Sequence, residues 1–378
     1  MQPREFHIWD FPENKIRILF RRHQEFIQKA IKYFNSRNSL SKYLGISSQE
    51  VYSWAVYQLY IPLKYVKLIA KKLKLNLNIL EKDIISYKGI NTSTPIFNPK
   101  LPVKESPEIF SIITHIICDG SVNKNGIPMY INSNKILIDN LNFIIKKNFG
   151  NFKENFYFGT GINKNCYQYR FPKIIIEIIE YIYNINFHKK KEIPSEIFKL
   201  PVKFSIAVIK AFADDEGSVD LNRRIGIVSI NKDLLIVLIK LLNEKLKFSY
   251  ISNILEKNSK PNKCYCFYIR PREIEKYQKI IGFNHPDKTA RLNSMVRYRR
   301  LRQQERHHGK VGETREKLLN LLNDRILSTY DIMKELKINK SNINSKVKQL
   351  KDTGVIIQHH KTGQTVFWTT NKNGIHIR

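Results

Sequence analysis

An internal repeat in the middle of the chain is the feature that most limits how this sequence can fold. The tetrapeptides Asp119-Gly-Ser-Val and Glu216-Gly-Ser-Val lie 97 residues apart. The same offset relates Asn134-Lys135 to Asn231-Lys232, and an offset of 98 relates Cys166-Tyr167 to Cys264-Tyr265. A nearly constant offset over such a length indicates two copies of one supersecondary unit, and hence a pseudo-twofold axis within one chain.

Each copy predicts the same order of elements. An apolar helix ends at the acid-Gly-Ser-Val sequence, and two strands, a helix, two strands and a last helix follow. We therefore expect an α+β fold in which residues 107–300 form a pseudo-symmetric duplicated αββαββα unit, with copies at 107–195 and 200–295. Gly120 and Gly217 are expected to end the two opening helices.

Close packing of the two opening helices is expected from small side chains four residues apart. These pairs are Thr114 with Cys118 and Ala211 with Asp215. Packing the helices would place Asp119 and Glu216, on their last turns, side by side. Acids at the C-terminal end of a helix oppose the helix dipole, so their presence in both copies favours a function over a merely structural role.

The N-terminal flank predicts an all-α helix-turn-helix domain over residues 1–90. Gly45 is expected to stop one helix, and Ser47 or Ser48 to cap the next helix, which runs from Gln49 to Tyr57. A further helix starts near Pro62 and would support the pair. Residues 91–106, rich in Pro, Ser, Thr and Asn, are expected to be a linker.

The C-terminal flank predicts a basic linker at 301–312 and a winged helix-turn-helix domain at 313–378. Ser328 is expected to cap the middle one of three helices, and Gly354 to end the third. Residues 355–357 and 365–368 are expected to pair as a hairpin, the wing.

The charge of the chain favours a polyanion, above all nucleic acid, as its partner. Lys and Arg number 65 against 33 Asp and Glu, a formal net charge of +32. Residues 1–106, 107–300 and 301–378 carry +10, +14 and +8, so each predicted domain is basic. A membrane partner is not expected, because the sequence shows no basic amphipathic anchor and no lipidation signal.

Other features of the sequence indicate a cytoplasmic protein. The four cysteines, Cys118, Cys166, Cys264 and Cys266, make no metal-type pair of pairs and are expected to be reduced thiols. We find no apolar stretch of about 18 residues and no signal peptide after Met1. Trp54 and Trp368 are expected in the core and not on a DNA-binding face.

The two opening helices resemble the motifs of LAGLIDADG homing endonucleases. The sequences are FSIITHIICDG at 110–120 and AVIKAFADDEG at 207–217, and LPVKESPE at 101–108 looks like the lead-in to such motifs in archaeal members of the DOD type. The resemblance covers about residues 101–290. Thr114, His115 and Ile117 depart from the motif, but each copy retains its essential acid. The chain lacks a C-terminal His-Asn, so an intein is not expected.

The resemblance implies a monomeric, Mg²⁺- (or Mn²⁺-) dependent enzyme that lays a four-stranded saddle from each copy on DNA. Asp119 and Glu216 would be metal ligands, with the backbone carbonyls of Cys118 and Asp215. Hard carboxylate oxygens suit Mg²⁺, which activates water and stabilises the leaving oxygen. Lys191 and Lys288 would polarise the attacked phosphates.

Polar and basic side chains on the expected saddle and in the flanking modules are candidates for DNA contact. Those on the saddle are Asn123, Lys124, Asn132, Arg170, Asn222, Arg223, Arg224, Lys263, Arg270 and Arg272. Those in the flanking modules are Ser48, Gln49, Ser341, Asn342 and Asn344. Two alternatives stay open: a transcription regulator that reuses the saddle without cleavage, and an RNA-binding splicing helper.

Overall fold

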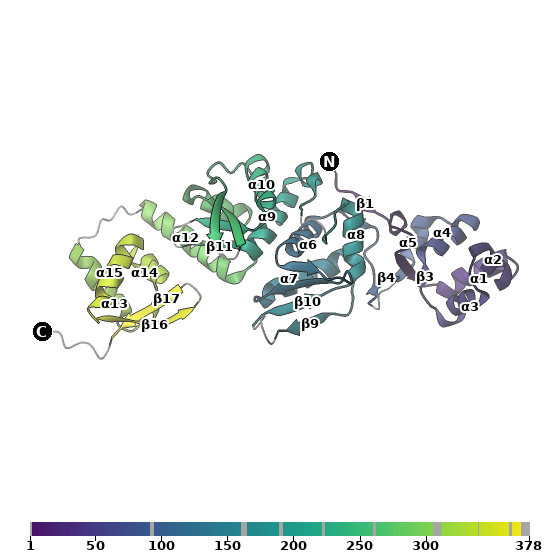
Figure 1. Cartoon of the computed structure of the whole chain (residues 1–378), viewed down its shortest axis with the longest axis horizontal. Coiled ribbons are helices and arrows are strands. Elements are labelled where there is room, and N and C mark those ends of the chain that lie inside the picture. The colour runs from purple at the N-terminus through teal and green to yellow at the C-terminus, as the bar shows by residue number, and fades with distance from the viewer. Residues whose placement is uncertain are drawn as a thin grey trace.

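The computed structural model describes residues 2–90, 94–159, 165–188, 192–220, 224–259, 262–304, 311–338, 340–362 and 365–371. The chain is elongated, and its parts follow one another along the long axis in sequence order (Figure 1). An N-terminal domain is followed by the two repeat halves and a C-terminal module. No helix of the described ranges is long and apolar enough to cross a membrane.

The N-terminal domain contains a sheet, so the expectation of an all-α domain is wrong. Its strands, in sheet order, are β3 (Ile61–Pro62), β2 (Ile16–Phe20), β4 (Ile84–Gly89) and β5 (Ile96–Phe97). In β2, Ile16, Ile18 and Phe20 are buried and the residues between them are half-buried, which is the period of two that a one-sided sheet requires. The helices are α1 (His23–Tyr33), α2 (Arg37–Leu44), α3 (Ser48–Tyr57), α4 (Leu63–Lys72) and α5 (Leu77–Lys82).

The turn between α2 and α3 confirms the predicted stop and cap. Gly45 has a left-handed φ of 68° after α2. Ser47, one of the two expected caps, accepts a hydrogen bond from the backbone N–H of Glu50 at the start of α3. Trp54 is buried in the core, as expected.

The N-terminal domain is fastened to the first repeat half through the expected linker. Strand β1 (Glu5–Phe6) pairs with β6 (Val103–Lys104), and Phe97 of β5 bridges to Asn151 in the first repeat half. Ile96 and Val103 are fully buried. These parts of residues 91–106 are therefore packed structure, while the domain boundaries themselves stay a prediction.

The two repeat halves have the same order of elements. The first holds α6 (Pro107–Ile117), β7 (Gly120–Val122), β8 (Pro128–Asn132), α7 (Lys135–Phe149), β9 (Asn155–Phe158), β10 (Tyr167–Arg170) and α8 (Lys173–Tyr183). The second holds α9 (Val202–Glu216), β11 (Gly217–Val219), β12 (Ile225–Ser229), α10 (Lys232–Lys240), β13 (Leu255–Ser259), β14 (Asn262–Ile269) and α11 (Ile274–Ile280). Both sheets are antiparallel and ordered alike, β7-β8-β10-β9 and β11-β12-β14-β13.

Equivalent residues of the repeat have equivalent roles. Asn134 caps α7 and Asn231 caps α10, each with its side-chain oxygen on backbone N–H groups of the first turn. Tyr167 lies opposite Asn132 in the first sheet, and Tyr265 lies opposite Ser229 in the second. Residues related by the offsets of 97 and 98 therefore occupy equivalent positions in the two halves.

Helix α12 (Pro286–Gln304) leads to a C-terminal module with a core of its own. Its elements are α13 (Val311–Leu322), β15 (Leu327–Ser328), α14 (Thr329–Leu336), α15 (Lys340–Asp352), β16 (Ile356–Thr362) and β17 (Thr365–Thr370). Ser328 caps α14, Gly354 has a left-handed φ of 72° after α15, and β16 pairs with β17, all as predicted. Trp368 is buried in this second core. The remaining short helical segments are Ile8–Asp10, Ser195–Phe198, Leu241–Lys245 and Pro271–Glu273.

Candidate active site and nucleic-acid interface

The two motif helices, α6 and α9, pack together at the centre of the molecule. Phe110 of α6 and Phe204 of α9 meet edge to face, with ring centroids 5.6 Å apart. Glycine is required just beyond both helices because a Cβ on Gly120 would lie 2.4 Å from Cα of Ile116, and one on Gly217 would lie 2.4 Å from the carbonyl oxygen of Ala213. Gly217 has φ −86°, so close approach rather than a left-handed cap explains the residue, which corrects the expected reason.

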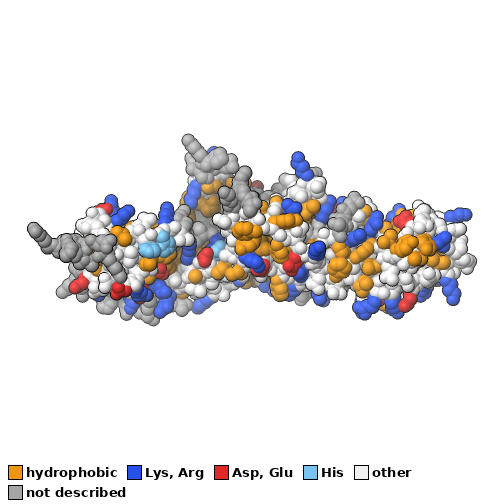
Figure 2. All heavy atoms as spheres, turned by 90° about the horizontal axis from the view of Figure 1, so that it is seen from below, with side chains coloured by type: hydrophobic (Ala, Val, Ile, Leu, Met, Phe, Trp, Pro, Cys, Tyr) orange, Lys and Arg blue, Asp and Glu red, His pale blue; other side chains and the backbone are white. Residues whose placement is uncertain are grey.

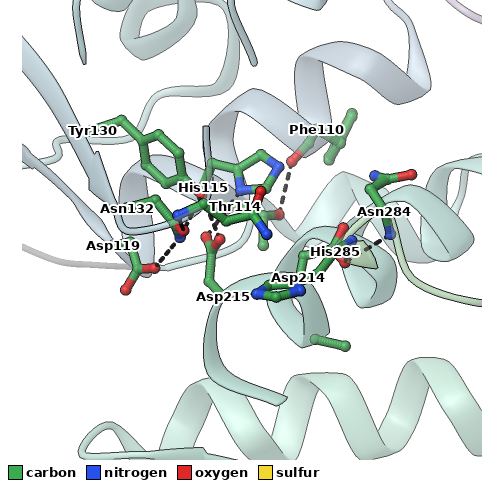
Figure 3. Close-up of polar contacts among 12 residues, drawn as sticks. Phe110, Thr114, His115, Asp119, Tyr130, Asn132, Asp214, Asp215, Asn284 and His285 are labelled. Carbon is green, nitrogen blue, oxygen red and sulfur yellow. Dashed lines mark hydrogen bonds and ion pairs between the residues drawn. The ribbon is translucent and has the colours of Figure 1, made fainter. Parts of the chain in front are cut away.

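A buried polar bridge joins the two helices where small side chains were expected (Figure 3). The side chains of His115 on α6 and Asp215 on α9 are both fully buried. Nδ1 of His115 lies 2.9 Å from Oδ2 of Asp215, and the hydroxyl of Tyr130 on β8 donates to Oδ1 at 2.6 Å. An ionised carboxylate only accepts, so His115 carries a proton on Nδ1. Burial alone would lower the pKa of His115, but the charge and hydrogen bond of Asp215, together with the charges of Asp214 and Asp119, raise that pKa above its ordinary value.

Asp119 lies two residues beyond the end of α6 and is held by Asn132. The amide nitrogen of Asn132 donates to Oδ2 of Asp119 at 2.9 Å and to the hydroxyl oxygen of Tyr130 at 3.2 Å. Burial, together with repulsion from Asp215, raises the pKa of Asp119 to about 6. Asn132 was expected to contact DNA; the structure places it on the helix-facing side of the sheet, where it orients an acid.

Asp119, Asp215 and a third acid, Asp214, lie in the corner where the C-terminal ends of α6 and α9 meet. Asp214 holds the loop that precedes α12. Its Oδ1 accepts the backbone N–H groups of Asn284 at 2.8 Å and His285 at 3.0 Å. The side chain is buried, and burial raises its pKa. Asp214 thereby fixes the start of the helix that carries Lys288.

Lys288 reaches the same corner from the first turn of α12. Its ammonium group donates to the backbone carbonyls of Ala213 at 3.1 Å and Asp215 at 3.3 Å, and also to that of Asp214. It thus neutralises the C-terminal end of α9, where a cation is favourable. Burial lowers the pKa of Lys288, although four neighbouring carboxylates oppose that shift.

The donor groups of this corner fit a hard cation. Four carboxylates lie near Lys288: Asp214 accepts two backbone N–H groups, Asp215 contacts His115 and Tyr130, and the other two, Asp119 and Glu216, are the motif acids. Within the described ranges no three His, Cys, Asp or Glu side chains are grouped closely enough to bind a metal. A Mg²⁺ ion would therefore need backbone carbonyls and phosphate oxygens beside these two acids, all of which are ligands that it prefers.

The strand register shows on which face of its sheet each candidate for DNA contact lies. Arg170 follows the buried Tyr169 in β10 and so lies on the face away from the helices, where it stacks over Tyr157 at 5.0 Å. Arg224 stacks over Tyr268 at 3.7 Å on the corresponding face of the second sheet. Lys263 shares a face with the buried Phe267 and pairs with Glu256 at 2.8 Å, so it lies on the helix-facing side.

The other saddle candidates lie in turns and loops. Asn123 shapes the β7–β8 turn, because its Oδ1 accepts the N–H groups of Asn125 and Ile127, and Lys124 is exposed in that turn. Arg270 and Arg272 are exposed beyond β14, and Arg272 lies over the ring of Tyr250. Lys191, Asn222 and Arg223 lie outside the described residues.

Sequence reasoning missed a basic and aromatic group on the open face of the second sheet. Lys257 of β13 lies 5.5 Å from the ring centroid of Tyr268 in β14, and Arg224 reaches the same ring from the β12 side of that strand. Gly226 leaves room for that ring, since a Cβ there would come within 3.1 Å of it. The alternation of side chains in β14 around Cys266 was the sequence signal that could have indicated this group. Figure 2 shows Lys and Arg side chains along the whole length of the displayed face.

The candidates in the flanking modules lie at the starts of helices. Ser48 is in the first turn of α3, where its hydroxyl donates to Asn38 and accepts from Arg37, and Gln49 is exposed beside it. In α15 Ile343 is buried in the module, whereas three neighbours on the other side of the helix are exposed: Ser341, Asn342 and Asn344. Both helices therefore present polar side chains outward.

Comparison with known proteins gives one family match and a set of partial structural likenesses. Residues 312–358 match the family described as "Bacterial regulatory protein, arsR family". The chain is similar to the homing endonuclease I-DmoI in complex with DNA and Mn, with 19% identity over 46% of this chain and 96% of that chain and a TM-score of 0.33. It is similar to the homing endonuclease I-WcaI bound to its DNA recognition sequence, with 17% identity over 49% and 85% of the two chains and a TM-score of 0.36. No protein of curated function matches.

Proposed function

We propose that the chain is a site-specific endonuclease of the two-motif LAGLIDADG type that hydrolyses both strands of duplex DNA with Mg²⁺ or Mn²⁺. The observation that carries the proposal is the meeting of the α6 and α9 ends, where four carboxylates act on the ammonium of Lys288. So many acids are costly to bury together unless a cation or a phosphodiester uses them. The pseudo-symmetric saddle and the flanking helix-turn-helix and winged-helix modules belong to the same proposal.

Each group has a role in this proposal. Asp119 and Glu216, with the carbonyls of Cys118 and Asp215, hold the divalent ions, which supply a nucleophilic water and stabilise the leaving oxygen. Asn132 orients Asp119. Lys288 holds the end of α9 and lies ready to attract a phosphate, and Lys191 would serve the other strand. Arg170, Arg224 and Lys257 contact the DNA backbone from the open faces of the sheets.

The test is cleavage of DNA by the purified full-length chain. A plasmid that carries the genomic sequence flanking the gene should be linearised in the presence of Mg²⁺ and left intact with EDTA. A chain that binds this DNA tightly but never cuts it, at any Mg²⁺ or Mn²⁺ concentration, would contradict the proposal.

A DNA-binding transcription regulator is the second candidate, and the family match at residues 312–358 favours it. In that case the chain would bind one genomic site tightly, alter transcription from it and leave it uncut. The same plasmid, examined by footprinting and by agarose gel, separates the two functions.

A further inference from the structure

Helix α12 connects the candidate active corner to the C-terminal module (Figure 1). Its start is fixed in the corner, because Asp214 on α9 accepts the backbone N–H groups of Asn284 and His285. Lys288, in the first turn of α12, donates to backbone carbonyls at the end of α9. Tyr298 lies further along the same helix, at a rise of about 15 Å from Lys288. One helix therefore carries groups of both places.

The contact between α12 and the C-terminal module is reciprocal. Tyr298 of α12 is only 3% exposed and belongs to the core of the module. Tyr330 of α14 packs in turn against the main core, and its hydroxyl donates to the backbone carbonyl of Arg291 at 2.9 Å. Met295 of α12 and Met333 of α14 are buried and line, with these two tyrosines, one small pocket between the helices. Each side thus supplies a side chain to the core of the other.

This docking fixes where the outward side of α15 lies. Helix α14 contacts α12 on one hand and α15 on the other. The exposed side of α15 carries Ser341, Asn342 and Asn344, and it keeps one position relative to Lys288 and the ends of the motif helices. A module on a flexible tether would instead reach flanking DNA at many spacings.

We propose that the docking of α14 on α12 fixes the spacing between the central DNA site and a flanking segment that the exposed side of α15 contacts, with Tyr330 as the residue that holds this spacing. The inference rests on the proposed function. Tyr330 is a positioning residue, because it acts on DNA only through the module. A rigid link concentrates the module at one place on the duplex, so the matched spacing binds tightly and any other spacing loses the contact.

The experiment measures binding of the full-length chain to duplexes of altered spacing. A duplex that it binds is selected from random sequence. Hydroxyl-radical footprints of the wild-type chain and of Asn342→Ala with Asn344→Ala identify the segment that α15 protects. Insertion of about five base pairs before this segment turns it by roughly half a turn of B-DNA. The insertion should weaken wild-type binding about ten-fold or more.

Tyr330→Ala is the variant that loosens the docking. It should bind the original duplex more weakly and lose less than about three-fold to the insertion, because an undocked module can reach either spacing. Ile326→Ala is the matched control, since it removes an exposed apolar side chain from the same module and should keep the wild-type dependence on spacing. A wild-type chain that tolerates the insertion as well as Tyr330→Ala does would overturn the inference.

A measurement without DNA tests the docking itself. In small-angle X-ray scattering the wild-type chain and Ile326→Ala should behave as one rigid particle, and Tyr330→Ala should show a broader range of particle shapes. Tyr330→Phe keeps the ring and loses only the hydrogen bond to Arg291. It should change scattering and spacing dependence in the same direction by a smaller amount, and it replaces Tyr330→Ala if that variant unfolds. Unchanged scattering and unchanged spacing dependence in the folded variants would overturn the inference.

The same duplexes separate failure of this inference from failure of the proposed function. A chain whose binding depends on spacing but which never cuts with Mg²⁺ or Mn²⁺ contradicts the endonuclease and supports the fixed spacing. A chain that cuts and tolerates the insertion supports the endonuclease and contradicts the fixed spacing. A chain that binds no duplex contradicts both.

Discussion

In the proposed function, single residues at the ends of α6 and α9 carry the chemistry. Asp119→Asn or Glu216→Gln should abolish double-strand cleavage, because each substitution removes a cation ligand, and should leave DNA binding near the wild-type level, because it also removes a charge that repels DNA. Gel-shift and cleavage assays on one site measure both. Asp139→Asn is the matched control, since Asp139 is an exposed acid that pairs with Lys135 on α7. A variant at position 119 or 216 that cuts like the parent would remove that residue from the site.

The raised pKa of Asp119 has a consequence for stability. The carboxyl ionises near its ordinary value of 3.8 in the unfolded chain and at about 6 in the folded chain. The folded state therefore binds the proton more tightly between these values, so stability falls as the pH rises through this window and stays lower above it. Asp119→Asn, which cannot ionise, should melt at a higher temperature than the parent at pH 8, and the difference should shrink towards pH 4. Melting without divalent metal tests this, and a difference that does not depend on pH would contradict it.

At the element scale, each motif helix depends on a glycine just beyond its end, where the chain passes close to the backbone of that same helix. A Cβ at Gly120 or Gly217 would lie 2.4 Å from backbone atoms that cannot move without shifting the helix. Gly120→Ala and Gly217→Ala should each lower the free energy of unfolding by about 1–3 kcal/mol or more, as overpacking does. Ser218→Ala, at an exposed position next to Gly217, is the control. Denaturant unfolding measures the effect, and a loss no larger than that of the control would refute the close approach.

Elements with a strong local signal were predictable from the sequence. Gly45, Ser328 and Gly354 end or begin helices through their own backbone and side-chain chemistry, so their roles hold in any tertiary context. The internal repeat predicted the order of elements in both halves, because the same sequence pattern occurs twice and each copy supports the assignment of the other. The N-terminal sheet was not predicted, because β3 and β5 are only two residues long and β3 pairs with β2, more than forty residues earlier in the chain.

The site was predictable only in part. The repeat pointed to Asp119 and Glu216, but the sequence carried no sign that His115, Tyr130 and Asp215 meet, because they lie on three different elements. The prediction that Asn132 and Lys263 contact DNA rests on their residue types and on their place in the expected saddle, and it stays a prediction. Their side of the sheet depends on strand register, which a shift of one residue reverses.

The charge of the whole molecule predicts how it binds DNA without regard to sequence. With a net charge of +32 spread over all three parts of the chain, contacts with about 6–10 phosphates should make affinity for a non-cognate duplex fall about 10³–10⁵-fold between 50 and 200 mM salt. Fluorescence anisotropy over a salt series measures the slope. A nearly flat titration would remove nucleic acid as the main partner.

The two ends of the chain should respond differently to truncation. The C-terminal module has its own core, so a chain ending at residue 304 should fold and cut, with weaker binding and a shorter footprint. A chain beginning at residue 94 loses β1 and leaves the buried Glu105 without Arg4, its partner at 2.9 Å, so it should be unstable. Circular dichroism and footprinting of both truncated chains decide this, and a stable chain from residue 94 would show that the N-terminal attachment is dispensable.

The pairing of β1 with β6 also orders events during synthesis. Residues 5 and 6 leave the ribosome before their partners at 103 and 104, which follow roughly a hundred residues later; at typical elongation rates that interval is about 5 to 20 s. Throughout that interval β1 has no strand to pair with, and Arg4 cannot yet form its ion pair with Glu105. The contact of β1 with β6 therefore forms only when the first motif helix is about to emerge, whereas the sheet of β3, β2 and β4 can pair before then.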